Sequence, residues 1–308
     1  MAFSPPRQIA GYHVLRQLGQ GGMSRVFLGY DVTTYTPVAI KILAEHLADS
    51  GTCLQRFHRE SRLCRILNHP NLIRGFESGY DREARRHYLV LEYIDGTPVH
   101  TLLRTQGRFP VGFAVHLAIQ LTDALHYLHE HNYVHRDIKP ENIMITLNGQ
   151  AKLGDFGLAK RISETSDLTM PHQGVGTPQY MPYEQWQNSA LVDGRSDLFA
   201  LGATLFHLLT GEVPFSGTTP SEILREKTCS LPPRIRDRDR NLPAEVDVIV
   251  ARAISPCIRQ RYQSAREFRD DLVKTGLADS DNYPGRAAAA DWPPGGDQCP
   301  TAFAGFSA

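Results

Sequence analysis

The order of apolar and polar positions divides the chain into a strand-rich part and a helix-rich part. Before residue 44, the runs YHVLRQL, RVFLGYD and PVAIKIL show the partial alternation typical of half-buried strands. Two more strand-like runs, LIRGF and HYLVLEYI, follow before DGTP breaks the pattern near residue 95. Farther on, SDLFALGATLFHLLTG is apolar on nearly every side, which predicts a central helix ending at the C-cap-like Gly211. The pattern predicts a small β-rich region followed by a larger helical one.

One helix is expected within the strand-rich part, over residues 52–67. Its residues Phe57, Glu60 and Leu67 fall at helical spacing and share one inward face. A carboxylate on an apolar face needs a partner. Lys41, in the strand-like VAIK, is flanked by apolar residues, so Lys41 and Glu60 would offset each other's desolvation by pairing.

Composition narrows the class of protein. A chain of 308 residues exceeds one ordinary hydrophobic core, so two lobes sharing a cleft are expected. Lys plus Arg and Asp plus Glu both number 33, which argues against a nucleic-acid or anionic-membrane surface. The start lacks a secretory signal pattern, and no apolar run is long enough to be a membrane segment. The five scattered cysteines form no C-x-x-C pair, so a cytoplasmic, reducing location is expected.

The glycine-rich stretch LGQGGMSRVFLGY has Gly19 and Gly21, with Ser24 at the place of the third glycine in a G-x-G-x-x-G pattern. Alone it is more typical of a plain hairpin turn than of a nucleotide site, and a dinucleotide-binding fingerprint would require a helix to begin there. Because Val26 and its neighbours continue as a strand, the glycines are expected at a hairpin tip. Such a tip brings backbone amides close to phosphates.

The stretch HRDIKPENIMI and the later LGDFG supply oxygen ligands and a candidate base. Each motif alone is also an ordinary polar turn. The Asn142 amide and the Asp155 carboxylate suit a Mg²⁺ ion that takes the rest of its shell from water and substrate phosphates. Asp137 is then left to accept a proton from an attacking hydroxyl.

Taken in this order, the glycine hairpin, Lys41, Glu60, HRD with its asparagine, and DFG resemble the eukaryotic-type (Hanks-type) serine/threonine protein kinases. GQGGMSRVF and GTPQYM look most like the bacterial members. The resemblance implies an α+β, bilobal kinase fold over residues 11–275, with a β-rich N-lobe over 11–94, including one key helix, and a larger helical C-lobe. Residues 276–308 lack periodicity and are expected to form a disordered tail.

The resemblance also implies an ATP site. Gly19 and Gly21 would cover the phosphates, and Lys41, held by Glu60, would position the α- and β-phosphates. The residues expected around adenine are Leu18, Val26, Ala39, Met144, the gatekeeper Leu91, and the hinge backbone at Glu92 and Ile94.

The implied function is transfer of the ATP γ-phosphate to Ser/Thr hydroxyls of proteins. Asp137 would orient the acceptor hydroxyl, and Lys139 would neutralise the transferred phosphoryl group. Asn142 and Asp155 would hold Mg²⁺, with Mn²⁺ as an alternative. Lys139, two residues after the aspartate, and Thr177 of GTPQY resemble the serine/threonine class.

Regulation is expected to involve the segment after DFG. Arg136 and Lys160 resemble cations that pair with an activation-loop phosphate. Thr169 is the expected autophosphorylation site, reached through self-association, whereas Gln173 stands where many eukaryotic kinases carry a phosphothreonine. Two further expected contacts join Asp197 to the HRD backbone and Glu184 to Arg261.

Two departures from the family pattern affect packing. Pro182 and Tyr183 of MPYEQ replace the usual residues before Glu184, so the substrate-side packing is expected to differ. Gly75 lies where a bulky residue usually joins the stack of Cys64, His135 and Phe156, so a gap is expected there unless Phe76 or another partner fills it.

Two other functions fit the same fold. A pseudokinase scaffold would bind nucleotide or partners without catalysis, but every catalytic position is filled. A small-molecule phosphotransferase is disfavoured by Lys139 and by the full activation segment through Glu184.

Overall fold

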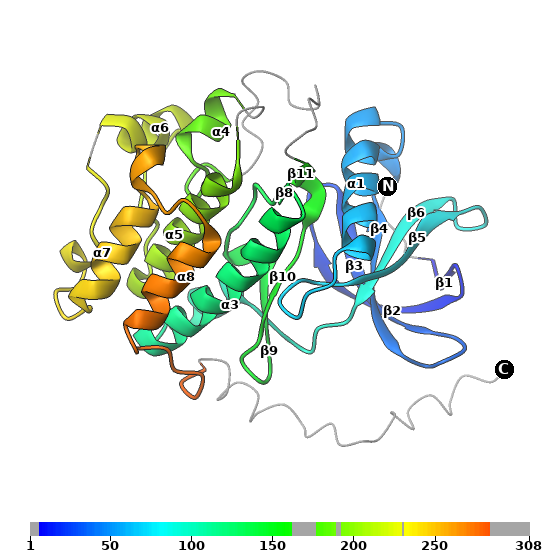
Figure 1. The fold of residues 1–308 in the computed structure, drawn as a ribbon. Helices are drawn as coiled ribbons and strands as arrows, with labels where there is room; N and C mark the ends of the chain where they lie inside the picture. The colour runs from blue at the N-terminus through cyan, green and yellow to red at the C-terminus, as the bar shows by residue number, and fades with distance from the viewer. Residues whose placement is uncertain (1–5, 162–176, 189–191, 230, 284–308) are drawn as a thin grey trace.

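The computed structural model describes residues 6–161, 177–188, 192–229 and 231–283. It consists of a lobe built on an antiparallel sheet with one long helix, joined to a larger lobe built on helices (Figure 1). This arrangement confirms the predicted bilobal α+β architecture.

The N-lobe contains a six-stranded antiparallel sheet in the order β1-β2-β3-β4-β6-β5. Its elements are β1 (Gln8–Ile9), β2 (Tyr12–Gln20), β3 (Ser24–Asp31), β4 (Pro37–Leu43), β5 (Gly75–Asp81), β6 (Arg86–Glu92) and helix α1 (Gly51–Ile66). The turn between β2 and β3 holds Gly21, so the predicted glycine hairpin is present. The apolar side chains of α1 face the sheet, and Glu60 is buried among them with 4% exposure.

The gap expected at Gly75 is absent. A Cβ atom at this position would lie 2.7 Å from the Cys64 Cβ and 3.0 Å from the Cys64 carbonyl carbon. Helix α1 therefore approaches β5 at the point where glycine lacks a side chain. The space is filled by Cys64 and the adjoining backbone of α1, whereas Phe76, the other candidate filler, is 45% exposed.

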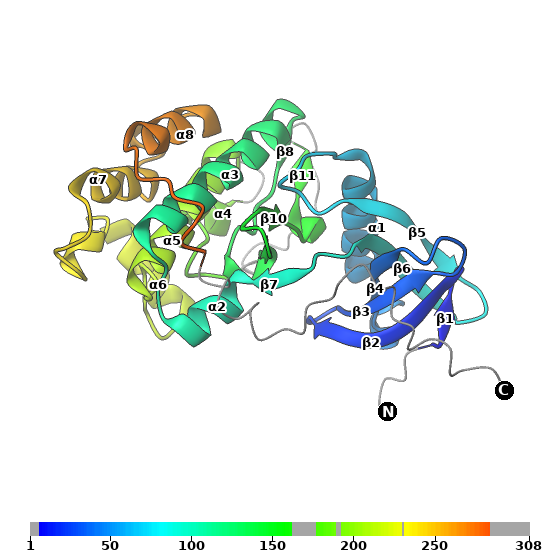
Figure 2. The ribbon, with the colours of Figure 1, turned by 90° about the horizontal axis from the view of Figure 1, so that it is seen from below.

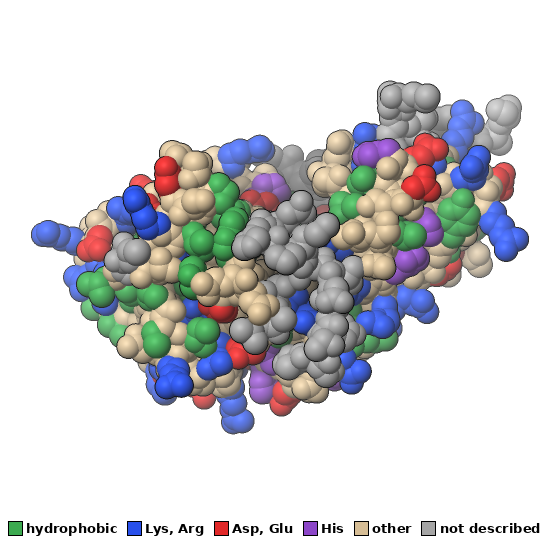
Figure 3. All heavy atoms as spheres, turned by 90° about the horizontal axis from the view of Figure 1, so that it is seen from above, with side chains coloured by type: hydrophobic (Ala, Val, Ile, Leu, Met, Phe, Trp, Pro, Cys, Tyr) green, Lys and Arg blue, Asp and Glu red, His purple; other side chains and the backbone are tan. Residues whose placement is uncertain are grey.

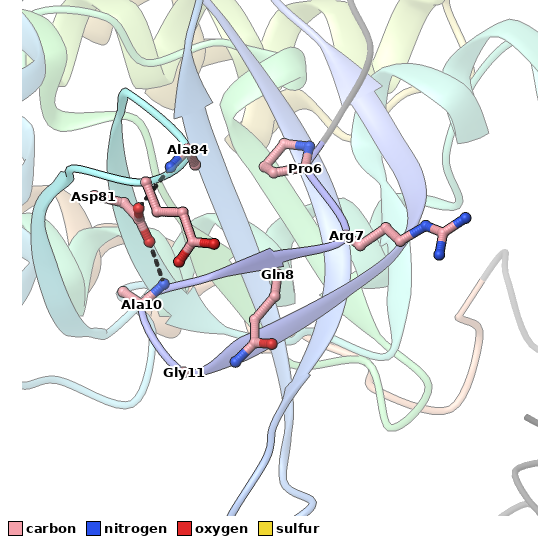
Figure 4. A pocket seen from close by; sticks show the side chains of 8 residues that line it. Pro6, Arg7, Gln8, Ala10, Gly11, Asp81 and Ala84 are labelled. Atoms are coloured by element: carbon pink, nitrogen blue, oxygen red, sulfur yellow. Dashed lines mark hydrogen bonds between the residues drawn. The ribbon is translucent and has the colours of Figure 1, made fainter. Parts of the chain in front are cut away.

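Strand β1 was not expected from the sequence, and it extends the sheet past β2. The Ala10 amide donates to Asp81 Oδ2 at 2.7 Å, and the Ala84 amide donates to Asp81 Oδ1 at 2.8 Å (Figure 4). A pocket beside this junction lies at the end of the N-lobe away from the helical lobe, as Figure 2 shows for β1. It is lined by Pro6, Arg7, Gln8, Ala10, Gly11, Asp81, Glu83 and Ala84.

The C-lobe surrounds the central helix α5 (Gly194–Thr210), which is buried on almost every side and ends at Gly211 in a left-handed conformation (φ 77°), as predicted. The other helices are α2 (Val99–Gln106), α3 (Val111–Glu130), α4 (Tyr183–Gln187), α6 (Pro220–Cys229), α7 (Ala244–Ala253) and α8 (Ala265–Lys274). Two small sheets face the N-lobe: β7 (Gly96–Pro98) with β9 (Ile143–Thr146) and β10 (Ala151–Leu153), and β8 (Tyr133–Val134) with β11 (Lys160–Arg161).

The chain stays packed on the C-lobe beyond the predicted end at residue 275. The Asp279 amide donates to the Gly112 carbonyl at 3.0 Å. Tyr283 is 6% exposed, and its ring lies 5.3 Å from that of Phe113. The start of the predicted tail is thus part of the folded domain as far as Tyr283.

Surface charge is mixed. On the face in Figure 3, Lys and Arg side chains alternate with Asp and Glu over both lobes. None of the helices in the described part of the chain has the length and apolar character needed to cross a membrane.

Candidate active site

Lys41 on β4 and Glu60 on α1 form the expected contact. The Lys41 Nζ lies 2.6 Å from Glu60 Oε1 and 2.7 Å from Oε2, and it is 3.8 Å from Asp155 Oδ1. Burial lowers the pKa of Lys41, but the Asp155 and Glu60 carboxylates outweigh it and hold this pKa above its ordinary value. Lys41 is therefore a fixed positive charge beside Asp155.

Asp155 stands at the junction between β10 and the turn Phe156–Leu158. Its backbone is left-handed (φ 63°, ψ 74°), a strained conformation for a residue other than glycine. Its side chain is 46% exposed, and Lys41 lowers the pKa of the carboxyl group. The surroundings thus keep the half-exposed Asp155 carboxylate ionised beside Lys41.

The catalytic-loop candidates form a hydrogen-bonded group around Asp137. The Lys139 Nζ lies 2.8 Å from Asp137 Oδ2 and donates to Thr177 Oγ1 at 3.1 Å. The Asn142 Nδ2 donates to Asp137 Oδ2 at 2.9 Å and to the Asp137 carbonyl at 2.7 Å. These bonds fix the carboxylate of Asp137 between an amine and an amide.

The hydrogen bonds of Asn142 also show which of its atoms could bind a metal ion. Because both amide contacts of Asn142 use its nitrogen, its carbonyl oxygen is the atom left to bind a cation. Together with the ionised Asp155 it forms a pair of hard oxygen donors, which fits a divalent ion that keeps water and phosphate ligands.

Asp197, at the start of α5, holds the HRD backbone as expected. Its carboxylate accepts from the His135 amide at 2.9 Å and from the Arg136 amide at 2.8 Å. The Arg136 backbone is left-handed (φ 71°), and the buried Gln185 side chain donates to the Arg136 carbonyl at 2.8 Å. These contacts compensate the strain of that conformation. Gln185 was not expected to take part.

Comparison with known proteins identifies the group that shares this arrangement. A family model described as "Protein kinase domain" matches residues 12–273. The chain belongs to the protein kinase family.

Several curated relatives of this kinase are bacterial enzymes. Serine/threonine-protein kinase PknB of Mycobacterium leprae is 33% identical over 273 residues, covering 88% of this chain and 44% of that protein. The probable serine/threonine-protein kinase SCO3848 of Streptomyces coelicolor is 36% identical over 272 residues, which cover 87% of this chain and 40% of that protein. Serine/threonine-protein kinase PrkC of Bacillus subtilis is 32% identical over 274 residues, which cover 89% of this chain and 42% of that protein. The chain spans less than half the length of these relatives, and the resemblance to bacterial members is confirmed.

Protein kinases use ATP and a divalent metal ion. The register of the kinase's sheet pairs Val26 with Lys41 and Ala39 with Leu91. Because Ala39 and Lys41 alternate onto the same side of β4, these four side chains share one face. Gly19 is paired with Val26 at the end of the hairpin, and a Cβ atom on Gly19 would meet open space.

The remaining adenine-site candidates lie at the borders of this face. Leu18 is 38% exposed on β2, and Glu92 ends β6. Ile94 follows in the link to β7, and Met144 lies on β9 opposite Pro98.

The hinge has a support that the sequence analysis missed. The Lys152 Nζ donates to Glu92 Oε1 at 2.9 Å and to Oε2 at 3.0 Å, and the Arg74 amide donates to Glu92 Oε1 at 2.9 Å. Alternation in the strand AKL was a usable signal, since Ala151 and Leu153 are fully buried and Lys152 points to the other face.

The residues expected in the apolar stack beside DFG are all buried, and Cys64 and Phe156 belong to one hydrophobic core. The rings of His135 and Phe156, both fully buried, lie 5.2 Å apart, and His135 Nε2 is 3.1 Å from the Gly154 carbonyl. Cys64 of α1 is also buried, with 2% exposure.

The activation segment is described only at its ends. Thr169 and Gln173 lie outside the described residues. Lys160 is 5% exposed on β11, and Arg136 is 9% exposed. Burial lowers the pKa of Arg136 to about 10, against the attraction of Asp197.

The expected ion pair of Glu184 and Arg261 is present at the C-terminal end of the activation segment. Arg261 donates to the two Glu184 oxygens at 2.6 and 3.0 Å, and the Ser196 hydroxyl donates to Glu184 Oε1 at 2.8 Å. Pro182 is buried and precedes α4, where its fixed φ suits a helix start. The altered MPYEQ sequence thus keeps the anchor of the segment.

Proposed function

We propose that this chain is an ATP-dependent serine/threonine protein kinase. The single observation that carries the proposal is the Lys139 amine, which contacts both the Asp137 carboxylate and the Thr177 hydroxyl. This amine joins a candidate base to the loop that follows the activation segment, where an acceptor side chain would enter. The names of the curated relatives support the same activity.

In the proposed mechanism, Asp137 orients the acceptor hydroxyl and takes its proton, and Lys139 offsets charge on the transferred phosphoryl group. Lys41, kept charged by Glu60, orients the α- and β-phosphate oxygens. Gly19 and Gly21 at the hairpin tip would cover the phosphates, and the proposed catalytic machinery lies within residues 11–275. The proposed adenine contacts are Leu18, Val26, Ala39, Leu91, Glu92, Ile94 and Met144.

Asp155 and Asn142 are the proposed metal ligands. Mg²⁺ is the expected ion, with Mn²⁺ as an alternative, because both ligands are hard oxygens. When bound, the ion would neutralise phosphate charge.

We further propose that two copies of the chain associate transiently and autophosphorylate Thr169. A phosphate on Thr169 would pair with Arg136 and Lys160, the two cations that resemble the phosphate-binding residues of family members. A cytoplasmic location is proposed because the free thiols of Cys53, Cys64 and Cys257 suit a reducing compartment.

The test is the intact mass of phosphatase-treated protein after incubation with ATP and Mg²⁺, measured beside Asp137→Asn. Stepwise phosphate gain by the wild type, reduced about 10²- to 10⁴-fold in rate by the substitution, is expected. Mapping of the sites then tests Thr169.

The same experiment separates the alternatives. No phosphate gain together with thermal stabilisation by ATP would indicate a pseudokinase. Transfer to a small metabolite but to no protein would indicate a small-molecule phosphotransferase.

A further inference from the structure

Lys227, in the last turn of α6, has an unusual environment for a lysine. Its side chain turns into the C-lobe, and the residue is only 3% exposed. The Nζ lies 5.0 Å from the centroid of the Phe215 ring and 5.5 Å from that of Phe199. The two rings are stacked 6.0 Å apart and present their electron-rich faces to the amine.

The hydrogen bonds of Lys227 all go to one loop. Residues 177–182, the 177–182 loop, connect the end of the activation segment to α4. The Lys227 Nζ donates to the Met181 carbonyl at 2.5 Å and to the Pro178 carbonyl in a similarly short contact. Within the loop, the Tyr180 amide donates to the Thr177 carbonyl at 3.1 Å, which closes a turn around the amine.

Burial of this amine has an electrostatic cost. Among the described residues no carboxylate is in ion-pair contact with Lys227. Burial lowers the pKa of Lys227 to about 7, with Arg261 adding to the effect and with Glu184 and Glu226 opposing it. An apolar side chain would fill the same space without this cost. Stability alone therefore does not account for a lysine here.

The far end of the loop leads to the catalytic group. Thr177 accepts a hydrogen bond from Lys139 at 3.1 Å, and Lys139 lies 2.8 Å from the Asp137 carboxylate. A displacement of the loop would move Thr177 away from these residues.

We propose that Lys227 is a positioning residue that clamps the 177–182 loop from behind and so sets where a protein acceptor binds relative to Asp137. The inference rests on the proposed kinase function and adds a residue from α6 to it. Lys227 contacts neither the proposed ATP-binding residues nor Lys41 and Glu60. Its replacement should therefore affect the kinetics of the acceptor and not those of ATP.

The test compares Lys227→Met with Lys227→Arg and with Lys274→Met, a control on the exposed side of α8. The acceptor is the inactive Asp137→Asn form of the full chain. We expect Lys227→Met to lower kcat/KM for the acceptor at least about tenfold while the KM for ATP changes less than about twofold. Lys227→Arg, which keeps the donors and the charge, should recover most of the activity, and Lys274→Met should match the wild type.

Amide hydrogen exchange of the same variants provides a readout that does not need activity. Lys227→Met should accelerate exchange of the amides in the 177–182 loop and leave α5 unchanged. Unchanged loop exchange and unchanged acceptor kinetics would overturn the proposal. Accelerated exchange throughout α5, together with equal losses of kcat/KM for ATP and for the acceptor, would also overturn the proposal. Lys227 would then be merely structural. A wild type without phosphotransfer would refute the kinase function, while the exchange experiment would still decide whether the clamp exists.

Discussion

Two largely buried lysines, one in each lobe, have opposite electrostatic surroundings. Lys41 contacts Glu60 at 2.6 Å and lies 3.8 Å from Asp155, and its pKa is above the ordinary value. Lys227 contacts two backbone carbonyls and two aromatic rings, and its pKa falls to about 7. Carboxylates contact the Lys41 amine, whereas none of the described residues places a carboxylate in contact with the Lys227 amine, and this accounts for the difference.

The difference separates two uses of a buried amine. Lys41 remains charged at any physiological pH and is held at the cleft, which suits an amine that binds phosphate oxygens. Lys227 is sealed inside the lobe and binds only the protein's own carbonyl groups, which suits an amine that holds a loop. Each use predicts a distinct response to the same substitution.

The largest expected effect comes from replacing Lys41 with Met. Removing the phosphate-orienting charge should lower kcat/KM about 10³-fold, within the range for charges that act on a transition state. Lys227→Met should retain much more activity. Steady-state kinetics of both variants, with Lys274→Met as the control, check this, and losses of similar size in the two would contradict the division of roles.

The contact between Lys41 and Glu60 can also be disturbed by a substitution at Gly75, because Gly75 packs against α1. A leucine there would collide with Cys64, since even a Cβ atom would lie 2.7 Å from the Cys64 Cβ. Gly75→Leu should lower the free energy of unfolding by about 3 kcal/mol and weaken the Lys41–Glu60 contact by displacing α1.

The free energy of unfolding of Gly75→Leu, measured with urea, and its kinase activity should both fall. The matched control is Gly51→Leu, at the start of the same helix, where an added Cβ atom meets open space. Unchanged stability in Gly75→Leu would show that α1 adjusts without cost.

The contact between Lys41 and Glu60 could be predicted because each residue breaks a simple pattern. A glutamate on an apolar helical face and a lysine in an apolar strand both signal burial. Lys227 gives no such signal, since LREKT resembles an ordinary solvated helix. Its burial depends on Phe199, Phe215 and the 177–182 loop, which are distant in sequence.

Packing distances between elements could not be predicted from the sequence either. Gly75 could be recognised as a departure, but only the structure shows that α1 closes the gap. Strand β1 is two residues long, too short for an alternation pattern to reveal. The alternating and helical periods therefore predicted the lobes and most motif contacts, whereas long-range packing fixed the rest.

Only one of the two lysines should contribute to the pH dependence of stability between pH 7 and pH 9. The pKa of Lys227 is lowered from 10.5 to about 7 by burial, so between these values the unfolded state binds more protons and stability rises with pH. Relative to Lys227→Met, the wild type should gain roughly 2 kcal/mol between pH 7 and pH 9. Relative to Lys41→Met it should gain nothing there, because the raised pKa of Lys41 leaves it protonated in both states. Urea unfolding at pH 7, 8 and 9 measures both differences, and equal slopes would refute the assignment.

Lys152 provides the smallest expected effect and a third kind of amine in the same molecule. It pairs with both oxygens of Glu92 at 2.9 and 3.0 Å, yet it touches neither phosphate nor acceptor in the proposed mechanism. Because the pair is partly exposed, with side-chain exposures of 13% and 23%, its loss should cost little stability. Lys152→Met should raise the KM for ATP about threefold by loosening the hinge and leave the KM for the acceptor unchanged. That is the reverse of the Lys227→Met response, and a variant that changed the acceptor KM instead would show that the hinge and the 177–182 loop are not independent.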